Sequence, residues 1–473
     1  MRRRWRRGAR GPASTRGGGA RRCPSRSSRA WPTSGRTCER GNESCGGEDH
    51  GGQTREGIVI DYQARFARLT RVAERSLIRE LLKVSRQRDV ISFAGGFPDP
   101  STFPVAEIAE VTQEVLRTNA ALALQYGPTE GDPALRDQLV AWMAKDGLRV
   151  GREQVLVTTS SQQALDLVGK VFLDPGDVVV VELPSYLGGL QAFRAYGADL
   201  VGVPQDEEGI DADRLAETLR RLRGAGRRIK LLYAVPDFQN PSGVTWSRSR
   251  RERLLALARE VDALVVEDNP YREMRFAGAA PPPIAALDDE GRTLYLSTFS
   301  KTLAPGLRIG WIAGPEAVVA QCVTVKQAMD LCSPSLTQAI AAGLLRRGDL
   351  LRRLPATVAL YRRKRDVMLD ALAREMPQGV SWTRPEGGLF LWVRLPDELD
   401  AGALLPAAVE TGVMYVPGQA FFADGSGRNT LRLNFSYPSE DEIRTGIARL
   451  GALVRQATPA VHTIHSRGTT VSD

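Results

Sequence analysis

Histidine is almost missing from this sequence, and its few histidines lie near the chain ends. The 473 residues include three, His50, His462 and His465, so none falls between residues 57 and 457. Serine–histidine catalytic triads, histidine metal sites and imidazole acid–base catalysis are therefore excluded from that span. Any proton transfer in this part of the chain must use another type of side chain.

Cysteines and long apolar runs are also scarce. Two of the five cysteines, Cys322 and Cys332, lie between residues 57 and 457, and the others are Cys23, Cys38 and Cys45. Neither a disulfide framework nor a cysteine zinc site is indicated, and we expect no bound metal. No apolar run approaches the roughly 18 residues that a membrane helix needs. With 42% hydrophobic residues and a mean hydropathy of −0.24, the composition predicts a soluble, cytoplasmic protein with no membrane partner.

The formal net charge of +9 is confined to the N-terminal segment. Residues 1–56 contain 14 arginines, four glutamates and Asp49, whereas the other residues carry 50 basic and 50 acidic side chains. This balance argues against nucleic-acid binding. Residues 1–56 are rich in Gly, Ser and Arg and lack both apolar periodicity and a secretory h-region, which predicts a disordered leader. A transit peptide, a dispensable tail and an extension from a wrongly assigned start codon are the open alternatives.

From residue 57 onward the pattern predicts regular structure. Helices are expected at 63–85, 105–118, 134–145, 160–172, 350–375 and 401–411. Short apolar strands are expected at 155–157, 177–181, 229–235, 263–266 and 293–296. Such strands, alternating with helices, indicate an α/β fold with a mainly parallel sheet that helices cover on both faces. Segments at 381–395 and around Val413 and Leu431 indicate a smaller α+β domain, and residues 458–473 a polar tail.

Polar residues gather where the predicted strands end. Lys301 follows strand 293–296 in the stretch Ser297-Thr-Phe-Ser-Lys-Thr-Leu-Ala-Pro-Gly-Leu-Arg-Ile-Gly-Trp311. Ser160-Ser-Gln162 follow the first strand and open a helix, where free amides favour an anion. The remaining strand ends carry Glu182-Leu-Pro-Ser-Tyr186, Pro236-Asp-Phe-Gln-Asn240 and Glu267-Asp-Asn-Pro-Tyr271. Because ligands of parallel sheets bind beyond the carboxyl ends of the strands, these segments are predicted to share one site.

These motifs resemble those of the pyridoxal-phosphate-dependent aminotransferases of fold type I, class I/II. The resemblance covers about residues 60–457 and rests on Asn240-Pro-x-Gly, Asp268-x-x-Tyr271 and Ser300-Lys-x-x-x-Pro-Gly-x-Arg308-x-Gly310. The chain is most similar to the 2-aminoadipate and aromatic aminotransferase branch through Phe93-Ala-Gly-Gly-Phe-Pro, Tyr126-Gly-Pro-Thr-Glu-Gly and Ser161-Gln-Gln-Ala-Leu-Asp-Leu. It implies an aspartate-aminotransferase-like fold. The expected parts are an N-terminal helix and arm at 57–106 associated with the small domain, a cofactor-binding domain at 107–340 and a small domain at 341–457.

The resemblance implies roles for the residues around the coenzyme ring. Lys301 is the catalytic residue, because its amine binds the coenzyme covalently and then removes the substrate α-proton. Asp268 forms an ion pair with the ring nitrogen and keeps it protonated, while Asn240 and Tyr271 donate hydrogen bonds to the ring hydroxyl. Tyr186 resembles the aromatic residue that stacks on the ring.

The coenzyme phosphate is expected at the start of the helix at 160–172. Arg308 can form a charge-assisted fork to it, and the other implied partners are Ser160, Ser161, Gln162, Thr298 and Ser300. The family usually has Gly-Ser-Gln where this chain has Ser160-Ser-Gln. Ser160 therefore replaces a residue of special backbone freedom, and an ordinary helix-capping role stays open for it. Tyr126 is expected to reach the phosphate of the neighbouring subunit in a homodimer.

Substrate recognition needs a fixed cation for the α-carboxylate. Arg432 alternates with apolar residues in Thr430-Leu-Arg-Leu-Asn-Phe435 and resembles the arginine that binds this group. Arg79 is expected to contact an acidic substrate side chain, although a solvated helix arginine is the alternative, and Gly96 and Asn240 complete the implied substrate site. The function implied is transfer of an amino group from an L-amino acid to a 2-oxo acid by a ping-pong mechanism. A β-lyase or decarboxylase using the same coenzyme, or a ligand-sensing regulator module, are the alternatives.

Overall fold

Short apolar segments pair into a large sheet of eight strands in the order β2-β9-β8-β7-β6-β3-β4-β5. The computed structural model describes residues 61–67, 70, 80–81 and 90–458. The strands of the large sheet are β2 (Val155–Thr159), β3 (Val178–Leu183), β4 (Asp199–Asp206), β5 (Gly209–Ile210), β6 (Ile229–Ala234), β7 (Leu264–Asp268), β8 (Thr293–Thr298) and β9 (Ile309–Ala313). The pairs β7–β8, β6–β7, β3–β6 and β3–β4 are parallel, which confirms the predicted mainly parallel sheet.

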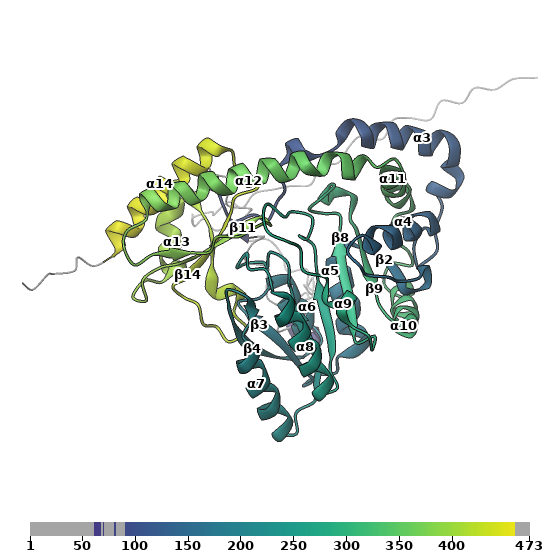
Figure 1. Cartoon of the computed structure of the whole chain (residues 1–473), viewed down its shortest axis with the longest axis horizontal. Coiled ribbons are helices and arrows are strands. Elements are labelled where there is room, and N and C mark those ends of the chain that lie inside the picture. The colour runs from purple at the N-terminus through teal and green to yellow at the C-terminus, as the bar shows by residue number, and fades with distance from the viewer. Residues whose placement is uncertain (1–60, 68–69, 71–79, 82–89, 459–473) are drawn as a thin grey trace, which may run out of the picture. The chain divides into compact units, whose positions relative to one another are not determined.

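Helices cover both faces of this sheet, as its two-sided burial requires. Alternate residues of the strands, such as Val179 and Leu231, pack with α5 (Ser160–Phe172), α6 (Leu187–Arg194) and α10 (Glu316–Gln327). The intervening residues pack on the other side with α4 (Pro133–Ala144), α7 (Ala212–Gly224), α8 (Arg248–Glu260), α9 (Ile284–Leu287) and α11 (Ser335–Arg346). Helix α3 (Val105–Ala123) contacts α11. The predicted α/β class is therefore confirmed (Figure 1).

Two strands run against the others, the short edge strand β5 beside β4 and the inner strand β9. β9 pairs antiparallel with both β8 and β2, and the sequence interpretation treated its residues only as part of the lysine motif. The loop from residue 299 to 308 joins β8 to β9 and includes a 3₁₀ turn, η4 (Pro305–Leu307). So short a connection brings the chain back beside its own strand, whereas a parallel neighbour needs a longer crossover. The reversal places Arg308 at the sheet edge that also carries Ser160.

Two strands are longer than predicted. β7 extends to Asp268 and β8 extends to Thr298, although apolar residues end at Val266 and Leu296. Pairing continues because Asp268 lies opposite Leu296 in the ladder, and both Asp268 and Thr298 are buried. Apolar patterning therefore ended the strands too early, since their last residues are polar groups that face the interior of a site.

A smaller sheet, β10-β11-β14-β13, is antiparallel throughout. It consists of β10 (Ser381–Trp382), β11 (Phe390–Arg394), β13 (Val416–Pro417) and β14 (Thr430–Asn434), and α12 (Asp349–Glu375), α13 (Ala401–Glu410) and α14 (Glu440–Ala457) flank it (Figure 1). β1 (Ile91–Ser92) pairs with β12 (Val413–Met414), so the chain before α3 joins the small sheet's side of the molecule. The expected domain boundaries at residues 106 and 340 stay predictions.

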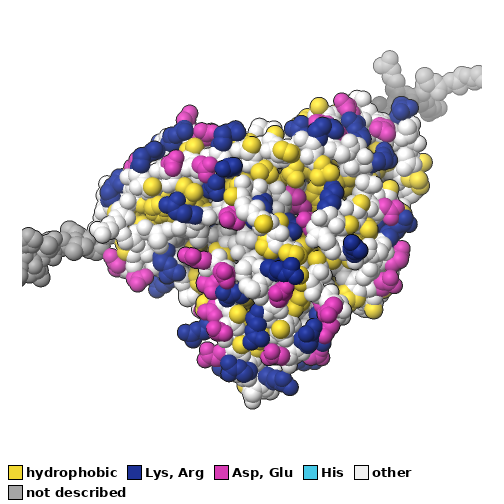
Figure 2. Space-filling view, in the orientation of Figure 1, with side chains coloured by type: hydrophobic (Ala, Val, Ile, Leu, Met, Phe, Trp, Pro, Cys, Tyr) yellow, Lys and Arg dark blue, Asp and Glu magenta, His cyan; other side chains and the backbone are white. Residues whose placement is uncertain are grey.

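The surface carries both signs of charge. Figure 2 shows basic and acidic side chains interspersed over the face in view. Many of them form ion pairs, for example Arg248 with Glu252 and Arg444 with Asp441. Across the described part of the chain, no helix has the combined length and apolarity to cross a bilayer.

Candidate active site

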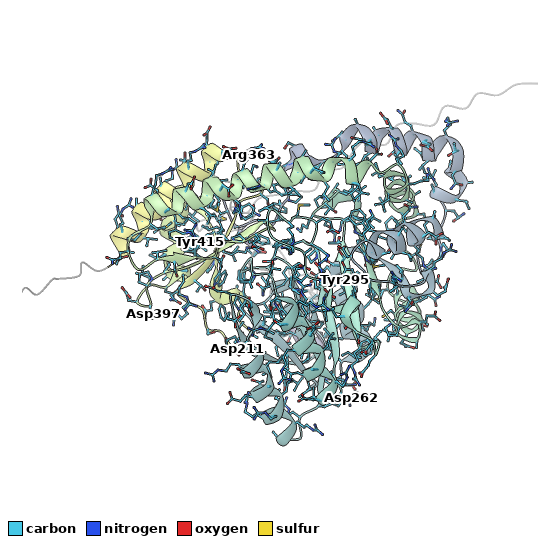
Figure 3. All side chains as sticks on the ribbon, in the orientation of Figure 1. Asp211, Asp262, Tyr295, Arg363, Asp397 and Tyr415 are labelled. Carbon is cyan, nitrogen blue, oxygen red and sulfur yellow. The ribbon has the colours of Figure 1, made fainter. Side chains whose placement is uncertain are left out.

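Lys301 lies in the turn after β8, between the large and small sheets. Figure 3 labels Tyr295 on β8 and Tyr415 beside the small sheet, which mark the two sides. The Lys301 amine donates a hydrogen bond to the carbonyl of Gly96 at 2.8 Å. Burial, together with the positive charges of Arg432 and Arg308, lowers the pKa of Lys301 to about 8. A minor fraction of this amine is therefore neutral near pH 7, and that fraction is available as a nucleophile or base.

Arg432, on β14, is a buried cation without an anionic partner. Its side chain is 1% exposed, and it donates hydrogen bonds to Asn240 Oδ1 at 2.8 Å and to the Ala94 carbonyl at 2.6 Å. Its guanidinium lies 4.3 Å from the ring centre of Phe390 and 5.1 Å from that of Phe421. Within the described residues no carboxylate pairs with it, and its Nε has no hydrogen-bond partner. Such an unpaired buried charge marks an anion-binding position.

Asn240 joins Arg432 to Tyr271. Its side-chain amide donates a hydrogen bond to the Tyr271 hydroxyl at 3.3 Å, while its oxygen accepts the bond from Arg432. Both Asn240 and Tyr271 are 4% exposed, and the Tyr271 ring packs edge-on against Phe390. The segments that follow β6 and β7 are thus held together with β14 in one continuous polar network.

Asp268, the last residue of β7, is a buried anion with half its hydrogen-bonding capacity unused. Its Oδ2 accepts a hydrogen bond from the Tyr233 hydroxyl at 2.9 Å, and its Oδ1 has no partner among the described residues. Burial raises the pKa of Asp268 to about 7, although the bond from Tyr233 opposes the rise. Few buried carboxylate oxygens in folded proteins lack a partner, so this oxygen is suited to a ligand donor.

A second polar group forms at the start of α5. The hydroxyls of Thr298 and Ser300 lie 2.9 Å apart, and Thr298 also donates to the Ile309 carbonyl. Arg308 is exposed and donates a hydrogen bond to the Ser160 hydroxyl, and no ion pair involves it in the described part of the chain. These hydroxyls, the unpaired guanidinium and the N-terminus of α5 together favour an anion.

Ser160 does not cap its helix in the ordinary way. The N-cap residue of α5 is Thr159, whose side chain makes no capping bond, and the Ser160 hydroxyl accepts the bond from Arg308. Both Ser160 (φ 66°) and Arg308 (φ 55°) adopt the left-handed conformation, and the Ser160 amide bonds to the Arg308 carbonyl at 3.1 Å. A Cβ at Gly310 would lie 2.5 Å from the Ser160 carbonyl carbon, so only glycine permits this approach. The left-handed geometry explains why the equivalent position favours glycine.

The remaining predicted residues make no described hydrogen bond to the network around Arg432, Asn240 and Asp268. Gln162 donates to the Gly188 carbonyl at 3.0 Å, and the half-buried Tyr186 contacts its side-chain oxygen at 3.4 Å. Ser161 lies at the first turn of α5. Tyr126 is 76% exposed, and no hydrogen bond links its side chain to the other candidates among the described residues. Arg79 and most of the predicted helix at 63–85 lie outside the described residues.

Sequence reasoning missed a buried charge cluster behind the site. Asp237 is fully buried and accepts bonds from Arg251 at 2.9 Å, Arg272 at 3.1 Å, Arg275 at 3.3 Å and Asn269 at 2.9 Å. Burial raises the pKa of Asp237, but the charges of Arg251 and Arg272 outweigh it and the net shift is downward. The cluster ties the loop that carries Asn240 to the loop that carries Tyr271. Its one signal in the sequence was an acidic residue just after the apolar run that ends at Val235.

Comparison with known proteins identifies the family. The family described as aminotransferase class I and II matches residues 88–450. The chain belongs to the class I and II aminotransferases. This aminotransferase is 47% identical over 402 residues to aromatic-amino-acid aminotransferase 1 of Thermococcus litoralis, covering 85% of this chain and 96% of the relative. It is 45% identical to the 2-aminoadipate transaminase of Thermus thermophilus, covering 80% and 94% of the two chains.

A solved structure agrees with this assignment. Kynurenine aminotransferase of Pyrococcus horikoshii, in complex with PMP, matches with a TM-score of 0.82 and 45% identity, covering 85% of this aminotransferase and 99% of that chain. The fold is aspartate-aminotransferase-like, as the sequence predicted. The coenzyme of the enzyme is pyridoxal phosphate, which the family uses. The residues present fit this coenzyme, because the unpartnered Asp268 oxygen suits a protonated ring nitrogen and the uncapped start of α5 suits a phosphate.

Proposed function

We propose that this aminotransferase moves an amino group from an L-amino acid to a 2-oxo acid by a ping-pong mechanism. The proposed donor is 2-aminoadipate-like, aromatic or branched-chain, and 2-oxoglutarate is the proposed acceptor. The names of the relatives from Thermococcus litoralis and Thermus thermophilus support the first two donor types. The observation that carries the proposal is the grouping of the Lys301 amine with the unpaired buried charges of Arg432 and Asp268.

Three residues are proposed to carry out the chemistry. When bound, pyridoxal phosphate supplies an electron sink for the bond that breaks at the substrate α-carbon. Lys301 is proposed to hold the coenzyme covalently and, once displaced by substrate, to remove and return the α-proton. Arg432 is proposed to bind the substrate α-carboxylate, which fixes the α-carbon near the Lys301 amine. Asp268 is proposed to keep a proton on the coenzyme's ring nitrogen.

Other residues are proposed to hold the coenzyme and substrate. Asn240 and Tyr271 are suited to the ring hydroxyl and Tyr186 to the ring face. Ser161, Gln162, Thr298, Ser300 and Arg308 are suited to the phosphate. Gly96, whose carbonyl accepts from Lys301, and Asn240, which contacts Arg432, are also proposed to border the substrate. Arg79 is proposed to contact an acidic substrate side chain.

The assembly and location of the enzyme are also proposals. A homodimer is proposed in which Tyr126 reaches the partner's phosphate site, and the high exposure of the Tyr126 side chain agrees with such a role. A cytoplasmic location is proposed from the composition of the chain.

The Lys301→Ala variant tests the central assignment. We expect it to lose the visible absorbance of covalently bound coenzyme and at least about 1,000-fold in turnover, since it removes both the anchor and the base. Lys170→Ala is the matched control, because Lys170 is an exposed lysine on α5. Assays of the wild type with 2-oxoglutarate and a panel of amino donors would then rank the substrates. A Lys301→Ala enzyme that kept its absorbance and turnover would refute the proposal.

A further inference from the structure

Asp268 and Tyr233 lie on one face of neighbouring strands. Tyr233 on β6 is paired with Val266 on β7, and Asp268 lies two residues beyond Val266. Because side chains alternate along a strand, Tyr233, Val266 and Asp268 point to the same side of the sheet. This register brings the Tyr233 hydroxyl to 2.9 Å from Asp268 Oδ2 and leaves Oδ1 without a partner in the described part of the chain.

The position of the Tyr233 hydroxyl is fixed by packing. Tyr233 is 1% exposed, and its ring packs edge-on against Phe193 of α6 at 5.4 Å between ring centres. A Cβ at Gly189, also on α6, would lie 2.7 Å from Cζ and 2.8 Å from the hydroxyl oxygen of Tyr233. Glycine at this position therefore provides the space that the hydroxyl occupies.

The direction of this hydrogen bond is set by the environment. Burial and the nearby charge of Asp268 raise the pKa of Tyr233 well above its ordinary value, so the phenol keeps its proton and donates. Burial alone favours the neutral form of Asp268, and the donated bond favours the carboxylate. In the described residues no cation pairs with Asp268, so Tyr233 is its one hydrogen-bond donor there.

We propose that Tyr233 is a positioning residue for the reaction, which holds Asp268 charged and turned so that its free oxygen serves the coenzyme's ring nitrogen. This inference rests on the role proposed above for Asp268. In this role Tyr233 acts through the carboxylate of Asp268, which it contacts directly. Loss of the Tyr233 hydroxyl should lower the degree of protonation of the ring nitrogen, although the Asp268 carboxylate that stabilises the proton stays in place.

Tyr233→Phe tests the inference, because it deletes one oxygen atom and keeps the ring. Apoenzyme is titrated with pyridoxal phosphate, and the ¹⁵N chemical shift of labelled coenzyme reports whether its ring nitrogen is protonated. We expect the dissociation constant to rise about 10- to 100-fold, the range for a lost hydrogen bond to a charged group. The ¹⁵N shift should move toward that of an unprotonated ring.

Three further variants separate the possible outcomes. Gly189→Ala keeps the hydroxyl but displaces it, and should shift the ¹⁵N signal in the same direction as Tyr233→Phe. Phe193→Leu perturbs the same packing without touching the hydroxyl, and should lower the melting temperature with an unchanged ¹⁵N signal. Asp268→Asn should lose the protonated signal.

Two results would count against different claims. If Tyr233→Phe and Gly189→Ala keep the wild-type affinity and ¹⁵N shift while Asp268→Asn loses both, the role of Tyr233 is overturned and the proposed function stands. If Asp268→Asn also behaves as wild type, the proposed role of Asp268 itself is wrong.

Discussion

Replacing Arg432 with glutamine should show whether this buried arginine serves substrate binding or the stability of the fold. Arg432 is fully buried, yet in the described part of the chain its hydrogen bonds go to the neutral oxygens of Asn240 and Ala94. A buried arginine that exists for stability is instead expected to pair with an acid, as Arg251 does with Asp237. Arg432→Gln should therefore impair binding of the substrate carboxylate while leaving the stability of the apoprotein almost unchanged.

The expected magnitudes follow from the burial of the charge. Burial lowers the pKa of Arg432 to about 10, so keeping it charged at neutral pH costs about 3 kcal/mol of folding free energy. The sign is clear, because the depressed value means that the folded state disfavours the charged form at any pH below 10. Glutamine removes this cost but also two hydrogen bonds of about 1 kcal/mol each and cation–π contacts of about 1 kcal/mol. These contributions nearly cancel.

The loss of function should be much larger. Truncating one member of a buried charge pair costs about 2–5 kcal/mol of binding, which corresponds to a KM for the amino donor raised about 30-fold or more. Steady-state kinetics measure this change, and urea unfolding of the apoprotein measures stability. The matched control is Arg251→Gln, which removes one buried cationic partner of Asp237 while Arg272 and Arg275 remain, and it should lower the free energy of unfolding by about 1–3 kcal/mol. If Arg432→Gln destabilised the protein equally and left KM unchanged, Arg432 would be a structural residue.

Three further outcomes are expected. Coenzyme uptake by the apoenzyme, followed by absorbance, should accelerate with rising pH around a midpoint of about 8, because the neutral Lys301 amine is the reactive form. In Arg432→Gln this midpoint should rise, because a nearby positive charge is removed. An uptake rate that does not change with pH would contradict the assignment. Gly310→Ala should lower the free energy of unfolding by about 1–3 kcal/mol, because the added Cβ clashes with the Ser160 backbone. Gly306→Ala is the control and should change this free energy little, because no atom lies near its added Cβ. Equal effects of the two variants would refute the steric argument. Arg79→Ala should raise KM for dicarboxylic donors more than for phenylalanine or leucine, and a uniform change would remove its proposed role.

The sequence was sufficient to predict a candidate site at the strand ends because strand ends are easily recognised, and the roles assigned to its residues stay predictions. Asn240, Asp268 and Lys301 each follow a short apolar run, and parallel strands bring their carboxyl ends to one edge. The weaker predictions were those that depended on side-chain direction. The Ser160 hydroxyl could have capped α5, but the left-handed backbone turns it to Arg308. Local pattern carries no information about such a choice.

Tertiary partners could not be predicted for similar reasons. From the sequence, Tyr233 is predicted to be an ordinary buried residue of an apolar strand. Its hydrogen bond to Asp268 depends on the register of β6 against β7, which the sequence pattern does not give. The burial of Asp237 depends on arginines up to 38 residues away in the chain. The antiparallel strand β9 was missed because its residues were interpreted as a motif, although they also complete the sheet.

The charges of the site are informative because the fold leaves them unbalanced. Where charge serves stability, as around Asp237, opposite charges meet directly. Around Lys301 the described residues place the unpaired Arg432 and the under-bonded Asp268, each of which is costly to bury alone, together with the exposed and unpaired Arg308. A bound coenzyme and a substrate carboxylate would supply the missing partners, so both should stabilise the protein that binds them. Because Asn240 contacts both Arg432 and Tyr271, occupation of the carboxylate position should also alter the hydrogen bonds at the other end of the same network.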